Sequence, residues 1–319
     1  MKEFMVANVL IAGAGQLGSR NLQGLSRYSK PLSIWVYDVS EESLTRAGER
    51  WAECAVRPHA VTYITDLKLI PATLDAAIVA TNANVRLQVV ESIGRLAKVR
   101  YWLLEKVLAQ EVGDLYAIAR ATAEANGAWV NTPMHLWPLY QEVLNRFRRG
   151  APIHASSVRF RGLACNAIHY IDLVSRWNNA SIRSINTDGL RNQWVPSKRP
   201  GFYEAEGRLI VSFSDGSTLL LEGDEQANDY SVSLQGDDDV WVIDEAGANA
   251  SSAGGQKIEA GILRQSDLIG PMLDELFKTG TCGLPTLTDS IAQHVPLLTA
   301  LLQHWNANMP GRLDYAPIT

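Results

Sequence analysis

Residues 6–18 read VANVLIAGAGQLG, and this segment indicates how the first part of the chain folds. The apolar run of residues 6–12 is compact and ends directly at glycines, which is typical of a strand buried on both faces of a parallel sheet. Because Asn8 interrupts the run and glycines follow it, we interpret it as a first strand and not as a signal sequence. A helix should follow to about Tyr28, since Pro31 then breaks the pattern.

The glycines of this loop have the spacing of a phosphate-binding turn. Gly13 permits a tight turn, Gly15 lets a pyrophosphate approach the backbone, and Gly18 lets the helix pack closely on the strand. The free N–H groups at the start of the helix can then bind phosphates. The spacing alone is a weak signal, and a tight turn without a ligand is the alternative.

Asp38 strengthens the interpretation of the loop as a dinucleotide site. It ends the second expected strand, residues 32–37, and lies twenty residues after Gly18. A carboxylate at this place accepts hydrogen bonds from the adenosine ribose hydroxyls. It also repels a 2′-phosphate, and the adjacent Val39 and Ser40 offer no cation, so the sequence favours NAD over NADP. The alternative is an aspartate on the surface with no ligand.

The pattern of the first 131 residues alternates between strands and helices. Further strands are expected at residues 61–65, 74–81, 100–105 and 128–131, and helices at residues 40–54, 85–96 and 112–126. This alternation predicts an α/β N-terminal Rossmann domain with a parallel doubly wound sheet. We expect it to span residues 1–132 and to bind the dinucleotide.

After Thr132-Pro133 the strand signals become those of hairpins. Helices are expected at residues 137–149, 167–177, 263–279 and 287–306, and strands at residues 153–161, 182–190, 208–214, 217–222, 230–235 and 240–244. Asp215-Gly216 and residues 236–239 look like hairpin turns, and residues 248–255 like a mobile loop. Residues 133–319 should therefore form an α+β C-terminal domain with a mainly antiparallel open sheet, for substrate binding and oligomerisation.

Composition narrows the class of protein. A net charge of -5 gives no broad basic field, so neither nucleic acid nor an anionic membrane is an expected partner. No apolar run approaches the ~18 residues that a membrane span needs. The three cysteines, Cys54, Cys165 and Cys282, are sparse and widely spaced. They favour a reducing compartment, the cytoplasm, and no histidine or cysteine spacing indicates a metal site.

Two pairs of residues end neighbouring strands at the edge where ligands bind in such sheets. Thr81 and Asn82 end the fourth strand, where they either border the cofactor or cap the next helix. Glu105 and Lys106 end the fifth. A partly desolvated lysine there can exchange a proton with a substrate hydroxyl, whereas the alternative is a solvated lysine at a strand end. Together with these strand-end residues, the loop residues Gln16 and Leu17 complete the expected cofactor site.

A second cluster of polar residues lies at the start of the helix predicted near residue 167. Asn166 and His169 are three positions apart and share a face, and Asp172 one turn further on can orient the imidazole. The alternative is a capping asparagine and a structural histidine.

The whole pattern resembles the Gfo/Idh/MocA family, named after glucose-fructose oxidoreductase, inositol dehydrogenase and rhizopine catabolism. The resemblance covers nearly the whole chain and implies that Lys106 and His169 are catalytic, with Asn166 as their polar neighbour. It departs from the family pattern twice. Val107 stands where the family has proline after the lysine, and Cys165 where it has an aspartate. The segments GLACNAIHYIDL and KRPGFYEAEG look like a branch associated with surface-sugar and nonulosonate gene sets.

The resemblance implies an oxidoreductase that acts on a sugar, a sugar acid or a nucleotide sugar. Candidate substrate residues are Arg161, Tyr170, Lys198 and Arg199; cations beside Trp194 suit an anionic sugar, although an exposed basic loop is the alternative. A non-catalytic NAD-binding sensor and an NADH-dependent imine or pyrrole reductase share the fold. Relatives commonly pair through the open sheet, so a homodimer or homotetramer is expected.

Overall fold

The computed structural model describes residues 6–54, 58–146, 153–226, 231–237 and 239–319. The chain forms two compact units, and each is discontinuous in sequence. The first unit comprises Met1–Leu108, Tyr116–Asn131 and Leu263–Thr288. The second comprises Ala109–Leu115, Thr132–Ile262 and Asp289–Thr319. The chain thus leaves the first unit and returns to it near its end.

A six-stranded sheet in the order β3-β2-β1-β5-β7-β8 forms the centre of the first unit, and its neighbouring strands are all parallel. Its strands are β1 (Ala7–Ala12), β2 (Leu32–Tyr37), β3 (Ala60–Ile64), β5 (Ala76–Val79), β7 (Tyr101–Leu104) and β8 (Gly127–Val130). A short parallel pair, β4 (Thr73–Leu74) and β6 (Lys98–Val99), accompanies it. The strand order reverses direction at β1, so the predicted doubly wound sheet is confirmed.

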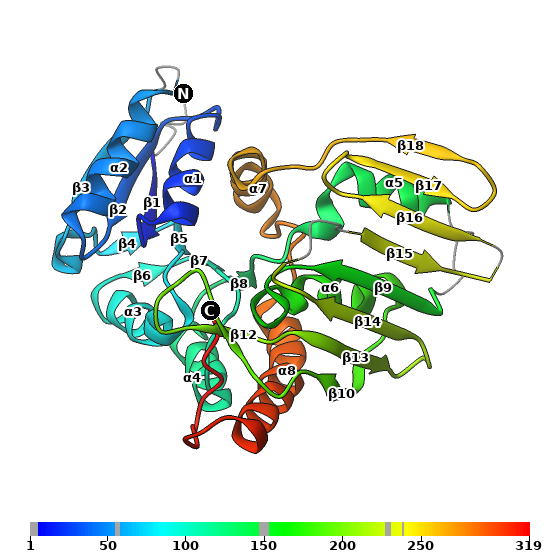
Figure 1. The fold of residues 1–319 in the computed structure, drawn as a ribbon. Coiled ribbons are helices and arrows are strands. Elements are labelled where there is room, and N and C mark those ends of the chain that lie inside the picture. The colour runs from blue at the N-terminus through cyan, green and yellow to red at the C-terminus, as the bar shows by residue number, and fades with distance from the viewer. Residues whose placement is uncertain (1–5, 55–57, 147–152, 227–230, 238) are drawn as a thin grey trace. The chain divides into compact units, whose positions relative to one another are not determined.

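Helices follow the strands of this sheet in the chain. They are α1 (Gln16–Leu25), α2 (Glu41–Ala52), the short η1 (Leu67–Leu69), α3 (Ala83–Leu96) and α4 (Val112–Ala121). Figure 1 shows α1 and α2 side by side along the strands β1 to β3. The strands β1, β5 and β7 are almost entirely buried, as strands covered on both faces should be.

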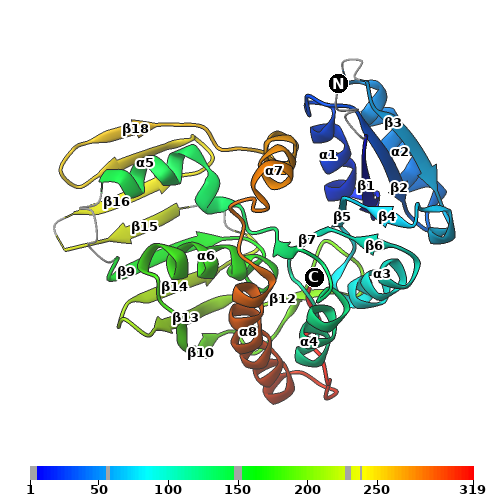
Figure 2. The ribbon, with the colours of Figure 1, turned by 180° about the vertical axis from the view of Figure 1, so that it is seen from behind.

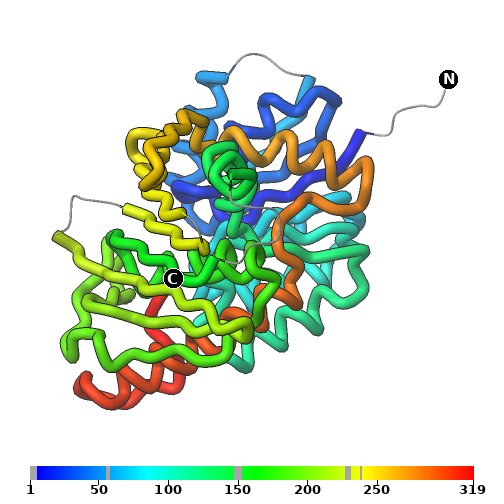
Figure 3. Tube along the Cα trace, turned by 90° about the vertical axis from the view of Figure 1, so that its right-hand side faces the viewer, coloured from blue at the N-terminus to red at the C-terminus, as the bar shows by residue number. Residues whose placement is uncertain are grey.

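Helix α7 (Gln265–Thr279) belongs to the first unit although it lies late in the sequence. It packs against α1, as the neighbouring orange and blue tubes of Figure 3 show. The approach is close at Gly24, where an added Cβ would lie 2.3 Å from Cγ2 of Ile269 and 2.7 Å from the main-chain oxygen of Ser266. Glycine at this position therefore lets two helices from distant parts of the sequence pack against each other.

The second unit contains an eight-stranded sheet in the order β10-β13-β14-β9-β15-β16-β17-β18. The strands are β9 (Ala155–Phe160), β10 (Ile182–Leu190), β13 (Gly207–Phe213), β14 (Thr218–Gly223), β15 (Ser231–Gln235), β16 (Val240–Asp244), β17 (Asn249–Ser252) and β18 (Lys257–Glu259). Only the β14–β9 pair is parallel among the strand pairs described for this sheet. The predicted mainly antiparallel sheet is confirmed.

Helices cover one face of the eight-stranded sheet. The helical segments of this part of the chain are η2 (Met134–Leu136), α5 (Pro138–Arg146), α6 (Leu163–Asn178) and α8 (Leu287–Asn308). Helices α5 and α6 lie behind the strands in Figure 1 and in front of them in Figure 2, so they share one face of the sheet. A separate small hairpin is formed by β11 (Val195–Pro196) and β12 (Tyr203–Glu204).

The turns and loops of the second unit agree only in part with the sequence-based predictions. The hairpin turn at Asp215-Gly216 is confirmed, because β13 and β14 are antiparallel neighbours. Strands β15 and β16 are antiparallel as well, but the turn predicted at residues 236–239 includes residue 238, which lies outside the described residues. The prediction of a mobile loop at residues 248–255 was wrong, since β17 occupies Asn249–Ser252. The backbone of β17 pairs with a strand on each side, and this pairing outweighs the small, polar composition of the segment. The expected helix end at residues 147–149 lies outside the described residues.

Helix α6 begins at Leu163, four residues earlier than predicted, because the left-handed Gly162 provides its N-cap. Within the described part of the chain, no helix combines the length and the apolar character that a membrane span requires.

Candidate functional site

The glycine loop between β1 and α1 has the geometry that the sequence predicted for it. Gly13 has a φ of +97°, and a Cβ there would lie 2.9 Å from the main-chain oxygen of Ala80. A Cβ on Gly18 would lie 1.7 Å from the main-chain oxygen of Gly13. These two glycines are therefore required by the fold itself. Gly15 differs, because a Cβ there would meet no atom within 4 Å.

The open position at Gly15 lies directly before the first turn of α1. Gly15 is the N-cap residue and has no side chain with which to cap the helix, and Gly15 and Gln16 are both exposed. Leu17, the next residue, is half-buried. Main-chain N–H groups at a helix start are unsatisfied within the helix and carry its positive dipole end. The loop thus leaves the start of α1 open for an anion to bind its main-chain N–H groups.

Asp38 is held against this loop by main-chain N–H groups. Its Oδ2 accepts a hydrogen bond from the N–H of Ala14 at 2.7 Å, and its Oδ1 accepts one from the N–H of Ser40 at 2.9 Å. Its carboxylate is thereby oriented at the end of β2, next to the glycine turn. Each oxygen retains acceptor capacity for a further donor, such as a ribose hydroxyl.

The guanidinium of Arg50, which the sequence analysis did not place at this site, contacts the first turns of α1. Arg50 of α2 donates from its Nη2 to Oε1 of Gln16 at 2.7 Å, and from its Nη1 to the hydroxyl of Ser19. Arg50 lies 34 positions after Gln16 and 31 after Ser19, so the local sequence pattern did not reveal these contacts. It follows from the packing of α1 against α2.

Thr81 and Asn82 follow β5 at the same edge of the sheet. Asn82 is the N-cap of α3, but its side chain makes no capping hydrogen bond. The Thr81 hydroxyl is buried and makes no hydrogen bond with any residue that the structure describes. Buried hydroxyls are normally paired. The capping alternative thus has no side-chain bond to support it, and Thr81 has an unused donor and acceptor.

Lys106 is the single accessible residue of a buried run. Among residues 101–110, all but Lys106 are buried, and Lys106 itself is half-buried. The peptide bond that joins Lys106 to Val107 is cis. Buried neighbours on both sides fix the backbone here and leave this amine as the group that the segment presents.

Glu105, the residue before Lys106, belongs to a buried polar chain. Its Oε1 accepts a hydrogen bond from Nδ2 of Asn131 at 2.7 Å, and the same amide donates to Oε1 of Gln265 at 2.9 Å. Gln265 donates in turn to Oδ1 of Asn21 on α1 at 2.9 Å. Burial raises the pKa of Glu105, and the Asn131 hydrogen bond and the charges of Arg86 and Lys106 partly offset this rise.

In the second unit, α6 presents the other predicted cluster. Cys165, Asn166 and His169 are half-buried positions on a helix whose remaining residues from Leu163 to Val174 are buried. These three residues therefore form one accessible strip at the first turns of the helix. The Asn166 amide donates to the main-chain oxygen of Arg161 at 3.3 Å.

Glu204 was not predicted, and it lies directly at the start of this strip. Its Oε2 accepts hydrogen bonds from the N–H groups of Ala164 at 2.9 Å and Cys165 at 3.2 Å. Burial raises the pKa of Glu204. Hydrogen bonds from Cys165 lower this pKa, and the nearby charge of Glu225 raises it further. A carboxylate from β12 therefore replaces the side-chain cap that Gly162 cannot provide. Its separation from α6 in the sequence concealed it.

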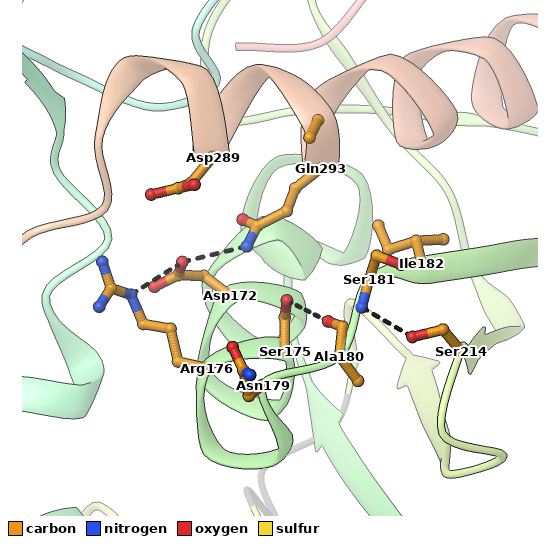
Figure 4. A pocket seen from close by; sticks show the side chains of 11 residues that line it. Asp172, Ser175, Arg176, Asn179, Ala180, Ser181, Ile182, Ser214, Asp289 and Gln293 are labelled. Atoms are coloured by element: carbon orange, nitrogen blue, oxygen red, sulfur yellow. Dashed lines mark hydrogen bonds and ion pairs between the residues drawn. The ribbon is translucent and has the colours of Figure 1, made fainter.

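Asp172 is buried and has partners on several helical segments of the second unit. Its carboxylate accepts from Nε of Arg176 at 3.3 Å and from Nε2 of Gln293 at 3.2 Å, and it lies 3.5 Å from Nδ1 of His135. Figure 4 shows the first two contacts at the wall of a cavity of about 510 Å³, beside Asp289. We therefore assign Asp172 to the packing of α6 against α8.

The predicted substrate residues fall in different environments. Tyr170 is buried, its ring lies 5.0 Å from that of Phe160, and its hydroxyl donates to Oε2 of Glu245 at 3.3 Å. Arg161 is half-buried next to the start of α6. Lys198 and Arg199 are exposed in the turn of the β11–β12 hairpin, which also carries Glu204.

Trp194, which the sequence grouped with these cations, is buried and donates from Nε1 to Nδ1 of His304 at 3.1 Å. It belongs to the core of the second unit. Among the described residues, no group of three histidine, cysteine or acidic side chains is placed to hold a metal ion.

Comparison with solved structures identifies proteins that share this fold. GenD2 from gentamicin A biosynthesis, in complex with NAD, matches with a TM-score of 0.71 and 19% identity, over 94% of each chain. Scyllo-inositol dehydrogenase from Lactobacillus casei, with bound NAD(H) and scyllo-inositol, matches with a TM-score of 0.70 and 15% identity, over 95% of this chain and 98% of the other.

UDP-N-acetylglucosamine 3-dehydrogenase GnnA from Acidithiobacillus ferrooxidans matches with a TM-score of 0.67 and 16% identity, over 94% of this chain and 96% of the other. No protein-family model matches the chain, and no curated protein matches it in sequence. The likeness establishes the two-part fold of these dehydrogenases over nearly the full length of the chain.

Proposed function

We propose that this chain is an NAD-dependent oxidoreductase that transfers hydride between the nicotinamide and a hydroxyl or keto group of a sugar, a sugar acid or a nucleotide sugar. The observation that carries the proposal is the space at Gly15. The fold requires glycine at positions 13 and 18 but not at position 15, where the helix terminus is left open. A loop that served only as a tight turn would have no need of that opening.

The residues around the loop fit a dinucleotide. Gly13, Gly15, Gln16, Leu17 and Gly18 would hold the pyrophosphate at the start of α1. The oriented carboxylate of Asp38 would bind the adenosine ribose hydroxyls and disfavour a 2′-phosphate.

The strand-end residues would border the nicotinamide half of the same cofactor. The unpaired hydroxyl of Thr81 and the uncommitted side chain of Asn82 supply polar groups there. Glu105 would support this region from the position before Lys106. GenD2 and scyllo-inositol dehydrogenase, which share the fold, were both solved with this cofactor.

Proton transfer is assigned to Lys106, with His169 assisting and Asn166 as a polar neighbour. When NAD is bound, its nicotinamide supplies the hydride acceptor. The amine of Lys106 takes the hydroxyl proton as the carbon loses hydride, and it returns a proton in the reverse direction. Its place as the one accessible residue of a buried run suits a group that must keep a fixed position.

An anionic sugar-like substrate is supported by the chemistry of the second unit. Arg161 lies at the start of α6, and Lys198 and Arg199 lie in the turn of the hairpin that contacts that helix. Guanidinium groups suit carboxylates and phosphates. The hydroxyl of Tyr170 is engaged by Glu245, so we expect it to contribute through packing more than through a direct bond to substrate.

We further propose that the part of residues 133–319 that belongs to the second unit serves substrate binding and self-association, as a homodimer or homotetramer. Paired residues form a row across the face of the eight-stranded sheet opposite α5 and α6: Asn186, Ile210, Leu220, Ser157, Ser233, Val242 and Ser251. Ile210 is 41% exposed and Val242 is 46% exposed. A partly exposed row of small and aliphatic side chains suits a second copy. The three cysteines are sparse and widely spaced in the sequence, which supports a reducing compartment such as the cytoplasm.

The proposal is tested by a dehydrogenase screen. Sugars, sugar acids and nucleotide sugars are incubated with NAD, formation of NADH is followed by absorbance, and NAD affinity is measured in parallel by calorimetry. Turnover of at least one compound is expected. High NAD affinity without turnover of any compound in a broad panel would show that the chain is a non-catalytic NAD-binding protein. If the chain does not bind NAD, the proposal is wrong.

A further inference from the structure

Arg86 is one of the largest fully buried side chains of the protein, although it carries a charge. It lies on α3 and is 1% exposed. Removing a guanidinium from water is costly, and arginine is almost never fully buried unless its donors are paired. The donors of a buried arginine at this position should therefore be paired with acceptors inside the protein.

The guanidinium donates to three main-chain oxygens. Nη1 donates to Val107 and, at 3.0 Å, to Leu108, and Nη2 donates to Thr81. Thr81 follows β5, and Val107 and Leu108 follow β7. The arginine therefore joins the chain segments that leave two neighbouring parallel strands.

These bonds begin where the pairing of the two strands ends. The β5–β7 register finishes at Val79 and Leu104, and the N–H of Glu105 then donates to the oxygen of Val79 at 3.0 Å. Beyond that point the two segments no longer pair as strands, and their carbonyl groups need other donors. Arg86 supplies donors to both segments at once.

Lys106 is the residue that this arrangement confines. It lies between Glu105, whose side chain is fixed by Asn131, and Val107, whose carbonyl is fixed by Arg86. The charge of Arg86 also faces the Glu105 carboxylate, whose pKa it lowers against the effect of burial. One side of the lysine is thus fixed through a side chain and the other through the main chain.

We propose that Arg86 is a positioning residue for Lys106: by binding the carbonyl groups of Val107, Leu108 and Thr81, it holds the lysine-bearing segment at a fixed place relative to the end of β5. The inference rests on the proposed function for its kinetic consequence, but the geometry that it describes does not depend on turnover. Hydrogen bonds from a planar, two-armed guanidinium can bridge two segments, which a single ammonium group does less well.

The test compares Arg86→Met, which keeps an unbranched side chain but removes the donors, with Arg86→Lys, which keeps one charged donor group. Arg95→Met is the matched control, because Arg95 lies on the same helix and is exposed. Each full-length variant is examined by thermal unfolding, NAD calorimetry, steady-state kinetics and amide hydrogen exchange read by mass spectrometry.

For Arg86→Met we expect kcat to fall by roughly 10- to 100-fold, as misplacement of a reacting group by about 1 Å can produce. KM and the NAD dissociation constant should change less than about threefold on this account, since the glycine loop is untouched. Hydrogen exchange should rise at residues 105–108 and stay unchanged at residues 9–18. Arg86→Lys should recover part of kcat, and Arg95→Met should match wild type.

Two outcomes would overturn the inference. In one, Arg86→Met exchanges faster throughout the first unit, which denotes a general loss of stability. In the other, kcat and exchange at residues 105–108 both equal those of wild type. If Arg86→Met does not fold, the same two criteria apply to Arg86→Lys. If wild type turns over no sugar, the proposed function fails, and the hydrogen exchange of the variants still decides whether Arg86 holds the Lys106 segment.

Discussion

The buried carboxylate of Glu105 accepts its hydrogen bond from the side-chain amide of Asn131 at 2.7 Å, directly before the accessible Lys106. Burial raises the pKa of Glu105 above its ordinary value of 4.5. The folded protein therefore binds more protons than the unfolded chain in the pH range between the unfolded and the folded pKa. In that range the free energy of unfolding falls as the pH rises.

We predict that Glu105→Gln removes this part of the pH dependence. Glutamine keeps an oxygen that can accept from Asn131 but cannot ionise, so the variant should lose less stability than wild type as the pH rises from about 4.5 toward neutrality. Urea unfolding at a series of pH values measures this. Glu91→Gln, at a half-buried site on α3, should follow wild type. A variant with the same pH slope as wild type would show that Glu105 is not a source of the dependence.

The choice between NAD and NADP should depend on the charge of Asp38. Wild type should bind NAD more tightly than NADP. Asp38→Asn should narrow the difference by roughly tenfold or more, because like charges about 4 Å apart repel by ~1–4 kcal/mol between bulk water and a protein surface. Calorimetry with each cofactor measures the change. Asp66→Asn is the control, since Asp66 follows β3 and accepts from the N–H of Lys68 in a similar turn. Equal binding of both cofactors by wild type would contradict the role of Asp38.

His169 should contribute less to turnover than Lys106. We expect His169→Ala to lower kcat by less than Lys106→Ala, whose loss should be ~10²–10⁴-fold, a typical range for a general acid–base group. Lys106→Arg should not restore activity, because guanidinium does not release its proton near neutral pH. Lys98→Ala, at an exposed position on β6, should behave as wild type. A larger loss for His169→Ala would reverse the two assignments.

The outer face of the eight-stranded sheet should mediate self-association. Light scattering after size exclusion should give a dimer or a tetramer. Val242→Asp should shift the protein toward monomer, since it places a charge within the partly exposed row of paired residues. Leu144→Asp, at an exposed position on α5, tests whether any new charge has this effect. If the wild-type protein remains monomeric at high concentration, this face of the sheet does not mediate self-association and the proposal is wrong.

The sequence predicted the features that depend on local pattern. The alternation of strands and helices gave the parallel sheet, and the spacing of Gly13, Gly15 and Gly18 placed the loop at the start of α1. The hairpin turn at Asp215-Gly216 could also be predicted, from the turn preference of these two residues. Each of these depends on residues that lie close together in the chain.

Residues that act across the fold escaped the same reasoning. Glu204 caps α6 from forty positions away, and Arg86 reaches the main chain at Val107 from another strand–helix unit. Trp194 looked like part of a basic surface segment, yet it is buried beside His304. The sequence predicted a helix near residue 263 but gave no sign that it packs on α1. In each case the missing information is tertiary contact, which short-range pattern does not contain.

Hydride transfer from a sugar to NAD, with Lys106 as the proton-transfer group, can be followed by isotope transfer. A sugar identified by the screen is prepared with deuterium on the carbon to be oxidised, and the NADH formed is analysed by mass spectrometry. Wild type should yield deuterated NADH, and Lys106→Ala, at equal NAD occupancy, should yield it at a rate lower by ~10² or more. NADH without deuterium, or transfer by Lys106→Ala at the rate of wild type, would contradict the account.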